Sequence, residues 1–180
     1  MCIRDRLGVF GAGWEHVFVS SALIQHHSVS SKEVNYLFPL YKYPPEGQRD
    51  FSKEREPNLG TPFIEEAQTA LGFEFALDGR GDLTTTFGPV DIFHYIYAVL
   101  HSPEYRRRYA DFLKSDFPRV PLTDDQVLFS ALVALGRNLV SLHLMETKGK
   151  DFPRFPNTGS NRVDQVRYCL LYTSPSPRDS

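Results

Sequence analysis

The hydrophobic pattern of the chain changes from short extended runs to helical periodicity near residue 88. Residues 17–21 and 34–43 are rich in the β-branched and aromatic side chains typical of strands. Pro39, inside the second run, favours an edge strand or a bulge. Residues 73–77 alternate like a half-buried strand, and residues 78–82 predict a turn whose glycines permit a positive φ. Residues 48–58 are highly charged and predict a solvated loop.

Helical signals begin at Thr61-Pro62, which open a short helix through Leu71 that Gly72 stops. A helix that is apolar on nearly every side then starts at Pro89 and reads as buried. Ser102 and Pro103 predict the break and the start of a second, amphipathic helix. Its shared face is expected to consist of Tyr105, Tyr109, Phe112 and Leu113.

Prolines stiffen residues 116–121 into an extended segment, and a last long helix follows them. Residues 123–126 have a capping-box pattern, and the helix is expected to end near Met145. One apolar stripe runs along it at helical spacing. The stripe consists of Leu128, Ala131, Leu132, Leu135, Leu139 and Leu142.

These elements predict an α+β fold. A β-rich portion, residues 7–86, has short strands and one short helix. A helical portion of about three helices follows at 87–148, and a further strand starts within 149–168. Residues 1–6 and 169–180 resemble translated sequencing-adapter remnants or disordered ends, so we set them aside from fold reasoning.

Charge is unevenly distributed, although the formal net charge is only -2. Residues 56–91 hold seven acidic and one basic side chain, whereas residues 106–119 and 148–168 each hold five basic and two acidic ones. Net acidity counts against a simple DNA-binding protein, but two basic segments around an acidic one allow a polarised surface. No apolar run approaches the ~20 residues of a membrane span, so we expect a cytoplasmic protein without membrane contact.

The sequence offers no recognisable catalytic, cofactor or metal site. Tyr43-Pro44-Pro45-Glu46 reverses the polarity that an adenine methyltransferase motif needs, and no glycine-rich phosphate loop is present. Asp125 and Glu146 would lie about 30 Å apart along one helix, too far to share a metal. The two cysteines lie in or against the excluded ends, and the six histidines show no ligand grouping.

Basic side chains allow two interpretations. Arginines 106–108 could pair within their helix, Glu104 with Arg108 and Arg107 with Asp111, leaving an ordinary solvated face. Alternatively, they could contact DNA phosphates, while polar side chains in or near loops read base edges. The candidate DNA-binding residues are Asn35, Lys42, Gln48, Arg49, Lys53, Arg55, Arg80, Arg106, Arg107 and Lys114.

Two segments carry a family resemblance. Residues 91–106, from Asp91-Ile92-Phe93-His94 to Glu104-Tyr105-Arg106, and residues 116–121, Asp116-Phe117-Pro118-Arg119-Val120-Pro121, resemble the C-terminal specificity domain of type ISP restriction–modification enzymes. Residues 17–19, the paired histidines 26 and 27, and residues 36–43 are similar to the same family. The resemblance covers most of residues 17–168.

The resemblance implies a non-catalytic piece of a large single-chain enzyme. It implies recognition of duplex DNA by the β-rich portion, with the helices as a spacer that docks this portion against the methyltransferase and helicase domains of the parent chain. S-adenosylmethionine, ATP and Mg would be used elsewhere in that parent, and this piece would bind no cofactor. The alternative is a protein-interaction or scaffold module without direct DNA binding, which net acidity favours slightly.

Overall fold

The described part of the chain combines short strands with helices, which confirms the α+β class. The computed structural model describes residues 2–4, 17–22, 24, 36–43 and 55–147. The chain divides into compact units of residues 1–148 and 149–180, and the second unit, with the strand expected there, lies outside the described residues. The elements are β1 (Cys2–Arg4), β2 (Val17–Val19), β3 (Tyr36–Phe38), β4 (Tyr41–Lys42), β5 (Glu56–Pro57), α1 (Thr61–Leu71), β6 (Glu74–Phe75), β7 (Thr86–Phe87), α2 (Pro89–His101), α3 (Pro103–Arg108), α4 (Ala110–Ser115) and α5 (Gln126–His143).

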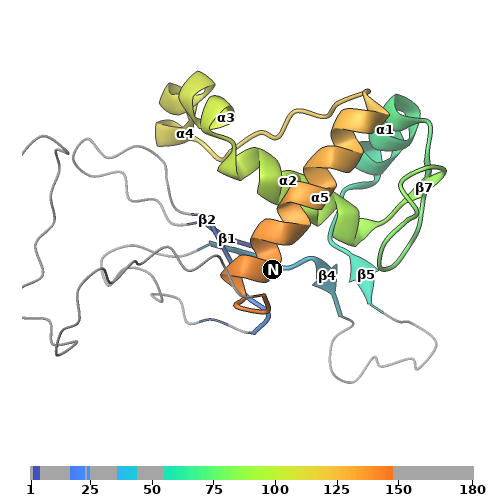
Figure 1. The fold of residues 1–180 in the computed structure, drawn as a ribbon, viewed down its shortest axis with the longest axis horizontal. Coiled ribbons are helices and arrows are strands. Elements are labelled where there is room, and N and C mark those ends of the chain that lie inside the picture. The colour runs from blue at the N-terminus through green and yellow to red at the C-terminus, as the bar shows by residue number, and fades with distance from the viewer. Residues whose placement is uncertain (1, 5–16, 23, 25–35, 44–54, 148–180) are drawn as a thin grey trace, which may run out of the picture. The chain divides into compact units, whose positions relative to one another are not determined.

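Helices α2 and α5 pack side by side and form the centre of the fold (Figure 1). The core includes Ile92 and Tyr95 from α2 and Phe129 and Val133 from α5, and all four side chains are buried. The helices meet at Gly136, where a Cβ atom would lie only 1.9 Å from the carbonyl oxygen of His94. Only glycine lets the two backbones approach this closely.

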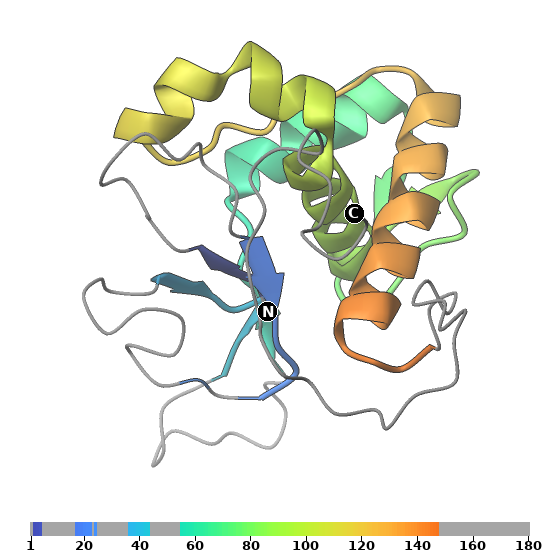
Figure 2. The ribbon, with the colours of Figure 1, turned by 60° about the vertical axis from the view of Figure 1, so that its left-hand side comes forward.

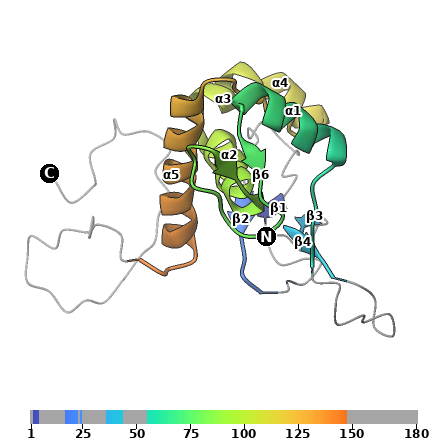
Figure 3. The same ribbon diagram turned by 90° about the vertical axis from the view of Figure 1, so that its right-hand side faces the viewer.

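The buried face of α5 overlaps the predicted leucine stripe only in part. Leu132 and Leu139 of the stripe pack against the core, but Leu128, Leu135 and Leu142 are exposed. The fully buried residues of the helix are Phe129, Val133, Gly136 and Val140. The reason is the close approach at Gly136, which turns the glycine side of the helix inward and the three exposed leucines outward. Figure 3 shows no described helix or strand on the side of α5 that faces away from α2.

Helix boundaries follow the local sequence signals closely. Helix α1 runs over the expected residues, and Gly72 closes it in the left-handed conformation. Ser102 caps α3 by accepting a hydrogen bond from the Tyr105 amide. The four helices α2–α5 replace the three expected, because the helical run after Pro103 is interrupted at Tyr109. Helix α5 is capped by Asp125, not by a capping box at Thr123.

The turn after β6 is held by carboxylates. The Asp91 side chain, 2% exposed, accepts hydrogen bonds from the Gly81 and Gly88 amides, which ties the turn to the first turn of α2. Asp82 accepts from the amides of residues 84–86, and these hydrogen bonds hold its pKa well below the ordinary range. Gly79 has the expected positive φ. Strands β6 and β7 pair in parallel around this turn.

The remaining strands form two small antiparallel sheets, of order β2-β1-β3 and β4-β5 (Figure 2). Pro39 lies between β3 and β4, and β3 is an edge strand of its sheet, as the proline favoured. Two differences from expectation appear here. Residues 2–4 form the central strand, because each pairs with both β2 and β3, although we set them outside the fold. Residues 56–57, expected in a loop, form β5 because they pair with β4.

Candidate nucleic-acid interface

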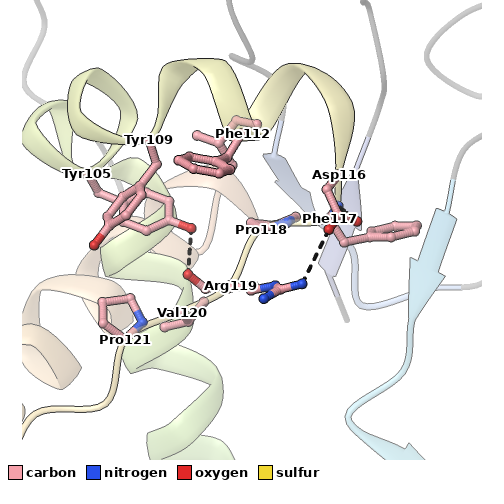
Figure 4. A pocket seen from close by; sticks show the side chains of 10 residues that line it. Tyr105, Tyr109, Phe112, Asp116, Phe117, Pro118, Arg119, Val120 and Pro121 are labelled. Atoms are coloured by element: carbon pink, nitrogen blue, oxygen red, sulfur yellow. Dashed lines mark hydrogen bonds and ion pairs between the residues drawn. The ribbon is translucent and has the colours of Figure 1, made fainter.

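A groove lies between helices α3 and α4 and the extended segment of residues 116–121 (Figure 4). Its volume is about 550 Å³. The helices supply aromatic side chains along one wall, and Pro118 and Val120 line the other. The segment of residues 116–121 that carries the family resemblance therefore forms one wall of the groove, and Tyr105, from the other such segment, lies in the opposite wall.

Two tyrosines fix the position of the extended segment. The Tyr105 hydroxyl donates to the carbonyl of Arg119 at 2.8 Å, and the Tyr95 hydroxyl donates to the carbonyl of Pro121 at 2.7 Å. Tyr95 is buried, and this burial raises the pKa of its hydroxyl. Because prolines also restrict the backbone of the segment, the groove is formed before any ligand arrives.

The aromatic wall differs from the expected helix face. Tyr105 and Leu113 are buried as expected, but Phe112 is 72% exposed and Tyr109 is half-buried. The break between α3 and α4 at Tyr109 rotates the following residues away from the face that a continuous helix would present. Phe112 therefore stands at the groove (Figure 4).

Short-range ion pairs surround the groove. Arg107 pairs with Glu104 at 2.7 Å, and Lys114 pairs with Asp111 at 3.0 Å. Arg119, which is 92% exposed, lies 3.6 Å from Asp116. Each pair joins residues three apart, so the expected i,i+4 pairs are wrong. The helix break explains the absence of a pair between Arg107 and Asp111, since these residues belong to different helices.

The proximity of Arg107 lowers the pKa of the Glu104 carboxyl, and the same contact raises the pKa of Arg107. All three pairs are solvent-exposed, and exposed pairs of this kind contribute little to stability. A phosphate group can therefore replace the acidic partners at little cost. From residue 104 to 119 the chain has five basic and three acidic side chains, so this surface is net positive.

Of the predicted DNA-binding residues, Arg106, Arg107 and Lys114 lie on the helices of the groove. Arg106 turns inward, because its Nε donates to the carbonyl of Leu100 at 2.7 Å near the end of α2. Its structural role is to cap that helix. Arg107 and Lys114 point their charges to solvent.

Other predicted residues lie elsewhere. Arg55 makes a two-pronged contact with the Asp78 carboxylate and stacks over the Tyr41 ring, 4.1 Å from its centroid. The contact with Arg55 lowers the pKa of Asp78, and Asp78 raises the pKa of Arg55 in return. Lys42 and Arg80 are exposed. The structure does not bring these three together with the groove; Asn35, Gln48, Arg49 and Lys53 lie outside the described residues.

A second, apolar cavity of about 310 Å³ adjoins the groove. Phe38, Phe93 and Ile96 are among the side chains that line it. Phe117, Pro118 and Val120 line both hollows, so this short stretch of chain separates them. Phe117 also contacts the ring edges of Tyr36 and Phe38 in β3.

His101 of α2 and His143 of α5 have structural partners. Tyr97 hydrogen-bonds His143 between their hydroxyl and Nδ1 atoms, and His101 Nδ1 contacts the carbonyl of Tyr97. Burial lowers the pKa of His101. Within the described residues, no three histidine, cysteine or acidic side chains are grouped so as to hold a metal ion. No described helix is long and apolar enough to cross a membrane.

Sequence reasoning missed three side chains of this surface, Phe112, Phe117 and Arg119. Their segments were identified, but Phe112 was assigned to a buried face and Arg119 only to a motif. The signal that could have indicated them is the combination of aromatic and basic residues in one short stretch, from 105 to 119.

Comparison with known proteins gives one match. The model of the family described as the Type ISP C-terminal specificity domain matches residues 9–170. No curated protein and no solved structure matches the chain.

Proposed function

This chain belongs to the type ISP C-terminal specificity domain family, and on that premise we propose that it binds duplex DNA and recognises a target sequence for a restriction–modification enzyme. The family itself implies target recognition. The direct binding of DNA and the surface that performs it are our proposal. The methyltransferase and helicase domains of a parent chain would be its other partners, in the cytoplasm.

The observation that supports this proposal is the set of exposed basic side chains on α3, on α4 and in the extended segment of residues 116–121. The charged groups of Arg107, Lys114 and Arg119 are exposed to solvent. Each of them forms one weak, exposed ion pair with an acidic side chain. Side chains of this kind bind phosphate oxygens and fix the register of a protein on a duplex without reading bases. Base reading would then belong to residues on loops and strands, such as Lys42 and Arg80.

Chemistry would take place elsewhere in the parent enzyme. We propose that S-adenosylmethionine, ATP and Mg are used by other domains and that this chain positions the target for them. Methyl transfer to DNA by the 180-residue chain alone, with S-adenosylmethionine supplied, would contradict this part of the proposal.

Fluorescence anisotropy with labelled duplex DNA, titrated between about 50 and 200 mM salt, tests the binding. We expect affinity to fall linearly with salt on logarithmic axes. Lys114→Ala and Arg119→Ala should each reduce that slope by about one, because each removes one phosphate contact. Arg137→Ala removes an exposed charge from α5 and should leave the slope unchanged. Binding that is absent at low salt, or independent of salt, would refute the proposal.

A second candidate function is a protein-docking module without DNA contact. The observation that favours it is the exposed face of α5, where Leu128, Leu135 and Leu142 recur at seven-residue spacing. Exposed apolar patches of this kind mark interaction surfaces. Replacing these leucines by serine should leave DNA affinity unchanged under our first proposal, whereas the docking module predicts loss of association with the rest of the parent chain.

A further inference from the structure

The turn between β6 and β7 presents an arginine that no neighbouring acid binds. Arg80 is exposed, and within the part of the chain that the structure describes its guanidinium group makes no hydrogen bond or ion pair. Carboxylates lie two residues away on either side, at Asp78 and Asp82. Asp78 binds Arg55 with both of its oxygens. Asp82 accepts hydrogen bonds from the amides of residues 84–86. Both acids therefore have other partners, and Arg80 remains accessible to a ligand.

The backbone on both sides of Arg80 is fixed by hydrogen bonds. The amide of Gly79 donates to the Tyr41 hydroxyl, in β4, at 3.0 Å. The amide of Gly81 donates to the buried carboxylate of Asp91, in α2, at 2.7 Å. The turn is thus tied to two other elements of the fold. A ligand of Arg80 would lose little affinity to the ordering of this turn, because the turn is already held in one conformation.

The charges around the turn disfavour an anionic ligand. The turn and the side chains that bind it carry two positive and three negative charges, a balance of -1, at Arg55, Arg80, Asp78, Asp82 and Asp91. The carboxylates weaken the attraction of Arg80 for a phosphate or for another carboxylate. They affect a neutral acceptor much less. Because the guanidinium group is a planar fork of donors, it fits two acceptors that lie side by side.

Guanine offers two neutral acceptors side by side, N7 and O6, at its edge in the major groove, and a two-pronged arginine is the commonest specific contact with it. We infer that Arg80 reads a guanine of the target sequence through hydrogen bonds to these two atoms. Lys114 and Arg119 would hold phosphates, whereas Arg80 would contribute sequence preference. The inference rests on the proposed DNA binding and adds which base one residue recognises.

The test begins with duplexes that the full 180-residue chain selects from a random-sequence library at about 50 mM salt. We expect the selected sequences to share a guanine for which Arg80→Ala shows no preference. Arg80→Ala should bind the selected duplex roughly 5- to 150-fold more weakly, because it loses one two-pronged base contact. The slope of its affinity against salt should stay unchanged, whereas loss of a phosphate contact would lower that slope by about one.

Modified bases identify the atoms that Arg80 contacts. At the selected guanine, 7-deazaguanine removes the N7 acceptor, and inosine keeps N7 and O6 but lacks the amino group in the minor groove. The first replacement should weaken binding by the parent chain but not by Arg80→Ala, and the second should change neither affinity. Arg137→Ala is the matched control, since it removes an exposed arginine of α5 and should keep the selected sequence and the response to 7-deazaguanine. Arg80 is exposed, so its replacement should preserve the urea midpoint, which is measured for every variant.

The other outcomes separate this inference from the proposed function. Selection of the same sequences by Arg80→Ala and by the parent chain would overturn the inference and leave the proposed DNA binding in place. So would an equal effect of 7-deazaguanine on both chains. A loss of affinity that is uniform across sequences, with the salt slope lowered by about one, would show that Arg80 contacts a phosphate and would also overturn the inference. If no duplex binds at about 50 mM salt, the proposed function and the inference both fail.

Discussion

Replacement of Gly136 by alanine tests the packing on which the helical core depends. The added Cβ would lie 1.9 Å from the His94 carbonyl oxygen, and ordinary contact begins at 3.4 Å. The backbones of α2 and α5 must therefore separate by about 1.5 Å, since the obstructing atom belongs to the main chain and cannot rotate away. Such a separation also loosens the contacts of Phe129 and Val133 with α2.

The magnitude follows from two opposing terms. Overpacking a core costs about 1–3 kcal/mol and sometimes more, and a clash with backbone belongs near the upper end. Alanine regains about 1 kcal/mol of helix propensity over glycine. We therefore expect the free energy of unfolding to fall by about 2 kcal/mol. With a urea dependence of about 1–3 kcal/mol per molar, the midpoint should fall by about 1 M.

Urea unfolding followed by circular dichroism measures this effect. Asn138→Ala is the control, because it places alanine at an exposed position of the same helix, where only propensity changes. Its midpoint should equal or slightly exceed that of the parent chain. A Gly136→Ala midpoint at or above the parent value would refute the close packing of α2 on α5.

Three further predictions concern buried polar groups. Burial, together with nearby arginines, lowers the pKa of His94 from 6.5 to about 4, so the unfolded chain binds more protons between these values. The free energy of unfolding should then fall by up to about 3 kcal/mol as pH drops from 6.5 to 4. Urea titrations at several pH values measure this dependence, and His94→Gln should make it weaker. Asp91→Ala leaves the amides of Gly81 and Gly88 without their acceptor. The free energy of unfolding should fall by about 1–3 kcal/mol for each amide that water does not reach. Asp124→Ala, at an exposed site, is the control and should lower it by under about 0.5 kcal/mol in the same assay. Tyr105→Phe removes one hydrogen bond from the wall of the groove and should lower the free energy of unfolding by about 1 kcal/mol. An unchanged thermal midpoint would show that this hydrogen bond does not stabilise the extended segment.

Local signals explain which parts of the fold were predictable. Helix α1 begins and ends where Thr61-Pro62 and Gly72 indicate, because a first-turn proline and a left-handed glycine act on their immediate neighbours. The same holds for Ser102 and Pro103 at the start of α3. These predictions need no knowledge of what the helices pack against.

Errors arose where tertiary contacts decide. The leucines of α5 form the stronger apolar stripe, yet Gly136 determines which side faces α2. Hydrophobic periodicity counts side chains and gives a glycine no weight, so the predicted stripe is rotated away from the buried face and only Leu132 and Leu139 of its leucines pack against the core. Phe112 was misplaced for a related reason, since a one-residue interruption at Tyr109 changes the direction of every later side chain.

The candidate site was predictable in part. Arg107 and Lys114 were predicted from charge, and the structure places them on α3 and α4, the helices that form one wall of the groove. The groove itself was not foreseen, because it depends on Tyr95 and Tyr105 reaching carbonyl groups 26 and 14 residues further along the chain. Sequence spacing carries no information about such distant pairings.

Few substitutions can be made in the segment of residues 117–120, which separates the groove from the apolar cavity, without changing the shape of one of them. Val120 touches the 550 Å³ groove on one side and the 310 Å³ cavity on the other, so a bulkier residue at this position must narrow one of them. A smaller residue would join the two spaces. Val120 is thus, like Phe117 and Pro118, a position where both gain and loss of volume alter the shape of the two hollows.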